Sequence, residues 1–421
     1  MRRTMPLTQA AAWERHISSL GDDLLLEIFL RLPSLATLVR AGCTCRAWRR
    51  AVASSPGFRR RFGAVHPPPL LGFFTDNSIV AESPAFVPAR PHGRDLAAAV
   101  RGGDFSLTSL ESPTPEEEEV EAPGWKILTG SCRRGNLILL NWEDKLLAVV
   151  NPLTQRSERV PRLVSKSMLQ GCQGHSVLAL LSSEEDPVPS RLMLLDHPGS
   201  RMKATIFSMD TGVCSETPYV DVPACPDQPD GRVLNGSAVQ LNGSVFYLLE
   251  NWRYTVSVDT ATMEFTVMEL PQWVWVSPTF FEVGETKDGA TCLVYSDGLD
   301  VGVLMHTRGA DGAQKWVLDR VVSMGAELQR VLQGQFDGAH ALEVFAAKDG
   351  YAYLSASLTL QHPGNRYWFL SLCLGTMKLE KLFQGTYGCS GVPYIMPWPR
   401  SLVGNYGRFA LNQRRSLKLH A

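Results

Sequence analysis

The 421-residue sequence lacks the long apolar runs of membrane and secreted proteins. It contains no run of about 18 apolar residues, the length that spans a bilayer. Its first 15 residues hold no apolar core of the kind that a signal peptide needs. The nine cysteines, an odd number spread along the chain, favour a reducing compartment over a disulfide framework. We therefore expect an intracellular protein, in the nucleus, the cytoplasm or both, without membrane contact.

The sequence also lacks the short motifs of common catalytic and metal sites. It has no Gly-x-Ser-x-Gly elbow, no glycine loop for phosphates or dinucleotides and no His-Glu-x-x-His. Cys43 and Cys45 are close, but no second cysteine pair or histidine cluster lies at zinc-ligand spacing. We therefore expect no enzyme activity, no cofactor and no metal site.

Lysine is absent from residues 1–66, which hold 11 arginines and 4 acidic residues, a net charge of +7. Residues 67–421 therefore carry a net charge of −8, because the formal net charge of the chain is −1. A basic segment can bind nucleic acid, but no aromatic platform or reading helix accompanies this one, so solvated faces of short helices are favoured. The composition is otherwise ordinary for a globular protein, and the length favours two domains.

Residues 22–32 predict a helix with more apolar surface than one core needs. On a helical wheel the apolar side chains cover about two-thirds of the circle, and Asp22, Asp23, Glu27 and Arg31 are left for water. A helix buried within its own domain would give the same wheel. A helix that also docks on a partner is the alternative.

Two further short helices are expected. Pro33 ends the first helix, Ser34 can cap a turn over residues 35–39, and a third helix is expected over residues 44–54, before Pro56. Three helices this short bury too small a fraction of their surface to be comfortable alone. This favours a unit that binds a partner.

The stretch resembles an F-box, the segment by which substrate receptors of SCF ubiquitin ligases dock on a Skp-family adaptor. The residues at the family's spacing are Leu20, Asp22-Asp23-Leu24, Glu27-Ile28, Arg31-Leu32-Pro33 and Cys45-Arg46-Ala47-Trp48. Gly21 departs from the family, which usually has proline there, and this loosens the approach to the first helix. The resemblance implies that Cys45 packs in the core at the start of the third helix. It implies a docking surface, with its immediate support, made of Leu20, Leu24, Ile28, Leu32, Pro33, Leu38, Val39, Cys45, Arg46 and Trp48.

From Leu70 onward the sequence predicts short β-strands. Pro69-Leu-Leu-Gly-Phe-Phe74 resembles the strand that follows the F-box in plant F-box proteins, especially those of grasses, and that opens their F-box-associated β domain. Asn242-Gly243 between two apolar runs predicts a hairpin turn. The other strand-like runs include residues 136–140, 146–150, 238–241, 244–248, 254–258 and 264–268.

These runs recur in units of about four strands, spaced by about 40 to 50 residues, which is typical of a β-propeller. The units are residues 130–162, 176–222, 235–271, 276–324 and 341–384, and residues 70–128 add a further one. The expected fold is therefore a small all-α F-box of three helices followed by a large all-β domain, a β-propeller of about six blades. An irregular β-sandwich is the alternative.

The expected boundaries follow from these patterns. They are a disordered N-terminus at residues 1–16, the F-box at 17–62, a Pro-rich linker at 63–69, the propeller-like domain at 70–405 and a tail at 406–421. Within the β domain, residues 81–124 are expected to form a long loop with a disordered acidic tip. Ser112 and Thr114 precede prolines in that tip.

The expected function is that of a non-catalytic adaptor. The resemblance implies that the F-box binds a Skp-family adaptor and, through it, a cullin, while the β domain binds a protein substrate. Trp273 and Trp275, two residues apart on an expected strand, would share one face and could anchor that substrate, although the sequence assigns no substrate-binding residue. One alternative is a small-ligand binder or enzyme built on the propeller, with a regulatory helical head. The other is an F-box scaffold or transcriptional cofactor without ubiquitination.

Overall fold

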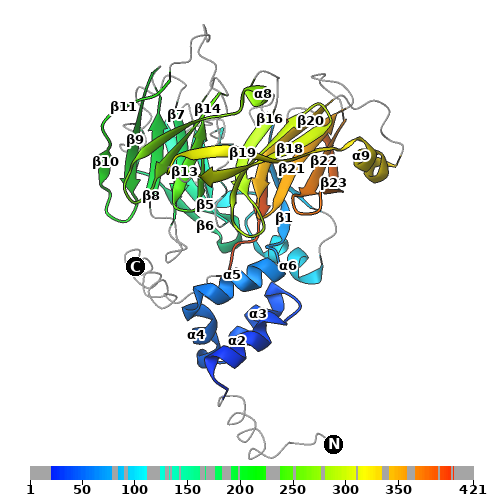
Figure 1. The fold of residues 1–421 in the computed structure, drawn as a ribbon. Helices are drawn as coiled ribbons and strands as arrows, with labels where there is room; N and C mark the ends of the chain where they lie inside the picture. Colours follow the sequence, from blue (N-terminus) through cyan, green and yellow to red (C-terminus); the bar gives the residue numbers. More distant parts are fainter. Residues whose placement is uncertain are drawn as a thin grey trace, which may run out of the picture. The chain divides into compact units, whose positions relative to one another are not determined.

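The structure, a computed structural model, divides into two compact units (Figure 1). The helical unit comprises Met1–Pro69 and Pro397–Ala421, and the propeller unit comprises Leu70–Met396. The residues described are 20–402 without 78–83, 90–92, 111–123, 129–131, 133–134, 142–143, 162–165, 167–175, 183–190, 198–199, 224–237, 250–252, 276–279, 310–311, 334–340, 358–365, 387–388 and 400–401. Within these residues no helix is long and apolar enough to cross a membrane.

The described part of the helical unit contains the three expected helices and a fourth. They are α2 Asp22–Leu30, α3 Leu35–Gly42, α4 Arg46–Ser54 and α5 Pro56–Val65. The Ser34 hydroxyl accepts a hydrogen bond from the Thr37 amide at 3.2 Å, which confirms the predicted cap of α3.

Helix α5 was not expected because Pro56 was interpreted as a helix breaker. Pro56 occupies the first helical turn, where the missing N–H would have no partner within the helix. The Ser55 hydroxyl caps this turn by accepting from the Phe58 amide at 3.2 Å. The helix therefore continues to Val65, into the stretch expected to be a Pro-rich linker.

The core of the helical unit includes one residue from far along the chain. Leu402 is buried together with side chains of α2, α3, α4 and α5, and Trp398 packs against the same cluster. From the sequence, residues 70–405 were expected to form the β domain. In the structure the propeller unit ends at Met396.

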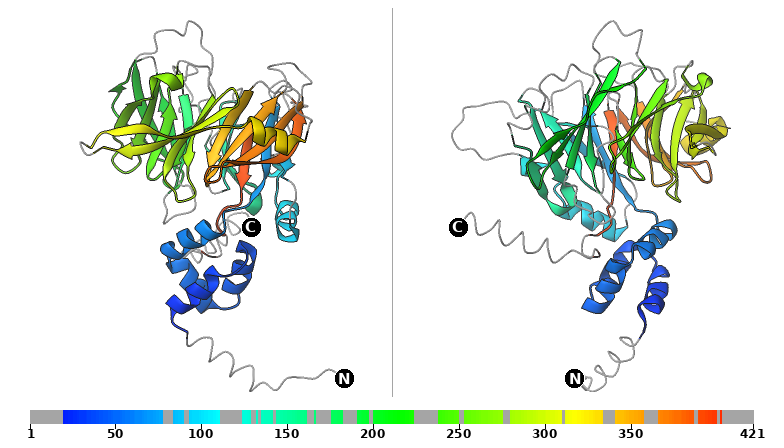
Figure 2. Two further views of the ribbon diagram at one scale, coloured as in Figure 1. Left: turned by 45° about the vertical axis from the view of Figure 1, so that its right-hand side comes forward. Right: turned by 60° about the vertical axis from the view of Figure 1, so that its left-hand side comes forward.

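The propeller unit consists of six antiparallel sheets, which confirms the expected blade count and excludes the sandwich (Figures 1 and 2). Blade 1 is β3 Lys126–Ile127, β4 Leu137–Asn141, β5 Leu146–Asn151 and β6 Arg156–Arg159. Blade 2 is β7 Ser176–Leu181, β8 Arg191–Asp196, β9 Arg201–Ser208 and β10 Cys214–Glu216, with β11 Val220–Asp221 also paired to β9. Blade 3 is β12 Val239–Leu241, β13 Ser244–Leu248, β14 Tyr254–Asp259 and β15 Phe265–Glu269.

The remaining blades complete the ring. Blade 4 is β16 Phe280–Glu285, β17 Thr291–Asp297, β18 Asp300–Arg308 and β19 Gln314–Ser323. Blade 5 is β20 Ala341–Lys348, β21 Tyr351–Ser357, β22 Arg366–Cys373 and β23 Lys378–Thr386. Blade 6 is β24 Cys389–Ile395, β1 Leu70–Asn77 and β2 Ala85–Pro88, in the order β2-β1-β24.

Blade 6 corrects the expectation that residues 70–128 form a blade of their own. Its strand β1 pairs with β24, near the other end of the unit, with Phe73 opposite Pro393 and Thr75 opposite Gly391. Strand β3, from the end of the expected segment, belongs to blade 1 instead. The ring is therefore closed by strands from both ends of the propeller sequence.

Short helices interrupt the blades and correct two further expectations. The expected loop at 81–124 contains β2, α6 Arg94–Gly102 and the 3₁₀ turn η1 Thr108–Leu110, while its acidic tip, with Ser112 and Thr114, lies outside the described residues. Trp273 lies in a single helical turn, α8 Gln272–Trp275, and not on a strand, so the two tryptophans do not share a strand face. The other short helices are η2 Pro152–Thr154 and α9 Gly325–Leu332.

The predicted hairpin at Asn242-Gly243 is confirmed. Both residues have positive φ, 47° and 81°, as the tight turn between β12 and β13 requires. The Asn242 side chain also donates to the Gly289 carbonyl at 2.9 Å and to the Thr291 hydroxyl at 3.0 Å, and so links blade 3 to blade 4.

Candidate docking surfaces

Helix α2 presents two large apolar side chains to solvent. Leu24 is 61% exposed and Ile28 is 49% exposed. They are four residues apart, so they lie on the same face of the helix. Their neighbours Leu25 and Phe29 are buried in the core of the helical unit. The helix therefore has one apolar face for its own core and a second one that the described part of the chain leaves uncovered.

The other residues of the expected docking set fall into two groups. Leu20, Leu32, Val39 and Trp48 are half-buried, and Leu38 is fully buried, so these side chains can at most support the surface or lie at its edge. Pro33, Cys45 and Arg46 are exposed.

Cys45 corrects the expectation of a core position. It does precede the third helix, but its side chain is exposed, and its Sγ accepts a hydrogen bond from the Trp48 amide at 3.5 Å. The thiol thus acts as the cap of α4, a role for which it must leave the core.

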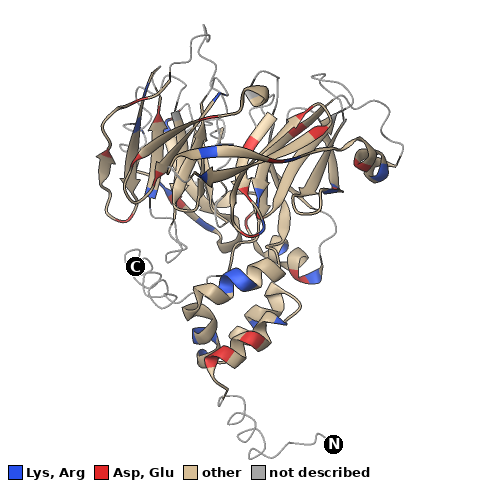
Figure 3. Cartoon of the chain, viewed as in Figure 1, with Lys and Arg blue, Asp and Glu red and all other residues tan. Residues whose placement is uncertain are grey.

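Helix α2 makes an aromatic contact with α4 and an ion pair with α5. The Phe29 and Trp48 rings meet edge to face, with centroids 5.4 Å apart. Arg61 of α5 forms an ion pair with Glu27 of α2, but both side chains are at least half-exposed, so this pair contributes little. Figure 3 shows the acidic residues of α2 and the basic residues of α5.

The propeller contains a cavity of about 90 Å³ where the strands at one edge of five blades converge. Its lining includes Glu282 and Glu285 of β16 and Lys348 of β20. The Lys348 ammonium group donates to the Cys132 carbonyl at 2.8 Å, and burial raises the pKa of the Cys132 thiol. Among the described residues, no group of three or more His, Cys, Asp and Glu side chains could hold a metal ion.

Several large aromatic residues of the propeller unit lie in its core. Trp316, Tyr367, Trp368 and Tyr394 are buried. Trp252, Tyr387 and the side chain of Trp275 lie outside the described residues.

Trp273, by contrast, is 45% exposed. Its ring centroid lies 5.4 Å from that of the buried Tyr295. Tyr295 pairs with Gly302, which pairs in turn with the exposed Val321 of β19. A β-carbon at position 302 would lie 2.1 Å from the Tyr295 ring, so glycine is needed there. Trp273 thus packs against Tyr295 of blade 4 while part of its ring stays exposed, and the exposed Val321 lies in register with Tyr295 across Gly302. The sequence did not predict this arrangement, since it depends on the register of three strands.

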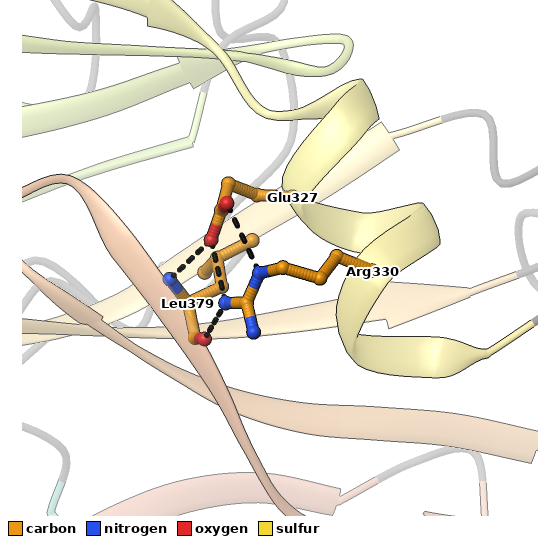
Figure 4. A network of polar contacts seen from close by, with 3 residues as sticks. All are labelled: Glu327, Arg330 and Leu379. Atoms are coloured by element: carbon orange, nitrogen blue, oxygen red, sulfur yellow. Dashed lines mark hydrogen bonds and ion pairs between the residues drawn. The ribbon is translucent and has the colours of Figure 1, made fainter.

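Helix α9 covers the outer strand of blade 5 through a polar clamp (Figure 4). Glu327 accepts from the Leu379 amide at 3.3 Å, and Arg330 donates to the Leu379 carbonyl at 2.8 Å. The two side chains also form an ion pair at 2.7 Å. The hydrogen bonds from Arg330 and then from the Leu379 amide lower the pKa of the Glu327 carboxyl. The pair thereby occupies both backbone groups of Leu379, as a neighbouring strand would.

Two family models match the chain. One, described as "F-box protein AT5G49610-like, beta-propeller", covers residues 129–399, more than half of the chain. The other, described as F-box-like, covers residues 17–62 and so includes α2, α3 and α4. A search among curated proteins finds no match.

Solved structures share only a distant likeness with the chain. Hydrazine synthase from Kuenenia stuttgartiensis is 14% identical, with a TM-score of 0.32 over 64% of this chain and 69% of that one. A luciferin-regenerating enzyme is 8% identical, with a TM-score of 0.31 over 62% of this chain and 77% of that one. Hsv2 from Kluyveromyces lactis is 12% identical, with a TM-score of 0.28 over 64% and 88%.

Proposed function

Because the chain belongs to the family of F-box proteins with an AT5G49610-like β-propeller, we propose that it is the substrate-recognition subunit of an SCF-type ubiquitin ligase. In this role the helical unit docks on a Skp-family adaptor and, through it, on a cullin. The propeller unit binds the protein to be ubiquitinated. The chain itself carries out no catalytic step.

One observation carries this proposal: the second apolar face of α2. A helix of nine residues that already buries Leu25 and Phe29 has no need to expose Leu24 and Ile28 for its own stability. Burying a side chain of this size is worth about 1.5–3 kcal/mol. The pair therefore provides a substantial driving force for binding a partner. Pro33 and Arg46, also exposed, are proposed to lie at the edge of this docking surface.

For the substrate, the propeller offers the exposed Trp273 and the exposed Val321 of blade 4. Tryptophan is among the residues that contribute most at protein interfaces. We propose these residues as the first region of the propeller to be tested for substrate binding.

We also propose an intracellular location, in the nucleus or the cytoplasm. The described cysteines at positions 43, 45, 132, 214, 292 and 373 are free thiols, which fits a reducing compartment. The likeness of Pro69–Phe74 to the corresponding strand of plant F-box proteins supports a plant origin.

The docking proposal is tested by titrating a purified Skp-family adaptor into the full chain and into the double variant Leu24→Glu with Ile28→Glu, using calorimetry. Both side chains are exposed, so the variant should unfold at the temperature of the wild type. Loss of their combined burial should weaken binding by about 100-fold or more.

The matched control is Val317→Glu with Leu318→Glu, which places the same two negative charges on exposed apolar positions of the propeller. It should bind the adaptor like the wild type. Equal affinity of the wild type and the double variant would contradict the assignment of the docking surface. Absence of binding by the wild type would contradict the proposed function.

A further inference from the structure

The helical unit is completed by a short segment that follows the last propeller strand. This segment, which we call the hook, consists of residues 397–399 and 402. Leu402 is 0% exposed and lies in one buried cluster with Leu25 and Phe29 of α2. The hook therefore contributes to the core on which the docking helix rests.

Glycine at position 42 makes room for the hook. Gly42 is the last residue of α3 and is buried. A β-carbon at this position would lie 2.8 Å from Cδ2 of Leu402. The end of α3 and the Leu402 side chain thus fit closely, and a methyl group at position 42 would require the Leu402 side chain to shift.

Hydrogen bonds within the hook stabilise its conformation. The Leu402 amide donates to the Pro399 carbonyl at 3.0 Å, and Nε1 of Trp398 donates to the Leu402 carbonyl at 3.4 Å. The Trp398 ring meets Phe62 of α5 edge to face, with centroids 5.9 Å apart. The segment therefore contacts α5 as well as α3, and it leaves Leu24 and Ile28 exposed.

We propose that the hook is an integral part of the adaptor-docking unit, so that the F-box docks well only in a chain that is complete through Leu402. The four helices end at Val65, more than 300 residues before the side chain that fills their core. Units of this size bury little surface, so the loss of one fully buried leucine is a large fraction of their stability. The helical unit therefore becomes competent to dock only after the propeller's final strand, β24, and the hook that follows it have been synthesised. The identity of the partner rests on the proposed function, whereas the packing of the hook within the helical unit does not.

The hook is tested by hydrogen exchange and adaptor titration on the full chain and on Leu402→Ala. Removal of a buried leucine is expected to raise the exchange rates of the slowest amides of α2, α3 and α4 by about 30-fold or more, and to weaken adaptor binding. The matched control is Leu332→Ala, an equally buried leucine of the propeller unit. It should speed exchange in blades 4 and 5 and leave the helices unchanged.

Two truncations keep the test decisive if Leu402→Ala unfolds the helices completely. A chain ending at residue 402 should match the wild type, and a chain ending at residue 396 should lose protection in α2–α4 while the propeller keeps its own. Unchanged exchange of the helices in both Leu402→Ala and the shorter chain would overturn the inference. If the wild type fails to bind the adaptor, the proposed function fails, and the exchange data still decide whether the hook supports the helices.

Discussion

Adjacent residues of α2 have opposite environments, and this is the residue-level basis of the proposed docking. Leu25 and Phe29 fill the core, and Leu24 and Ile28, each one position earlier, are exposed. One residue turns a helix by about 100°, so a single step moves a side chain from the core to the solvent. Substitutions at these two pairs should therefore separate folding from binding.

Phe29→Ala is expected to destabilise the helical unit, because it removes a buried ring and its edge-to-face contact with Trp48. The expected loss is about 3–5 kcal/mol in unfolding free energy. Leu24→Ala, at an exposed position of the same helix, should change it by less than about 0.5 kcal/mol. Hydrogen exchange of α2–α4 in the two variants measures both values. Similar losses in the two variants would contradict the assignment of the faces.

At this scale the sequence predicted what depends on near neighbours. The Ser34 cap and the Asn242-Gly243 turn are set within four residues, and both were predicted. The surplus apolar surface of α2 was also visible in its wheel. The exposure of Cys45 was not predicted, because its thiol caps α4 and does not pack in the core.

At the scale of elements, the errors came from residues that have more than one structural meaning. Proline can end a helix or begin one, and Pro56 begins α5. Apolar residues at alternate positions indicate a strand, yet Gln272–Trp275 form a helical turn between blades 3 and 4. Such ambiguities are resolved by the surrounding packing, which a short stretch of sequence does not contain.

Helix α9 shows how an inserted element protects a sheet. An unpaired outer strand is a site for unwanted pairing with other chains, and the Glu327–Arg330 clamp occupies the amide and the carbonyl of Leu379 on β23. Leu328 and Leu332 of α9 are buried in the same core as blades 4 and 5. Apolar burial therefore drives the packing of α9 on blades 4 and 5, and the clamp fixes the orientation of the helix against β23.

The clamp should make stability depend on pH. Because its hydrogen bonds lower the pKa of Glu327, its stabilisation is present above the ordinary glutamate pKa of about 4.3 and is lost as the pH falls through the lowered value. Glu327→Gln should thus lower the unfolding temperature of the propeller at pH 7 and have a smaller effect below about pH 4. Thermal unfolding at the two pH values measures this, with the exposed Glu264→Gln as control. A difference that grows on acidification would contradict the assignment.

In the whole molecule, two contacts join segments that are far apart in the sequence. Strand β24 pairs with β1 and closes the propeller, and Leu402 then enters the core of the helical unit. The repeat of strand-like runs predicted the number of blades, because five of the six blades are built from consecutive strands. It could not predict the pairing of β24 with β1 or the burial of Leu402 in the helical unit. A local sequence pattern does not determine which distant segment pairs with a strand edge or packs in a helical core.

We propose that one chain carries two separate protein-binding surfaces, the α2 face in the helical unit and a surface of the propeller unit. The most direct test of this proposal is immunoprecipitation with mass spectrometry under proteasome inhibition, comparing the wild type with the Leu24→Glu and Ile28→Glu double variant. We predict that the adaptor and cullin are recovered with the wild type and lost with the variant, while the other captured proteins are retained or enriched. Recovery of the adaptor with both chains, or joint loss of all partners, would contradict the account.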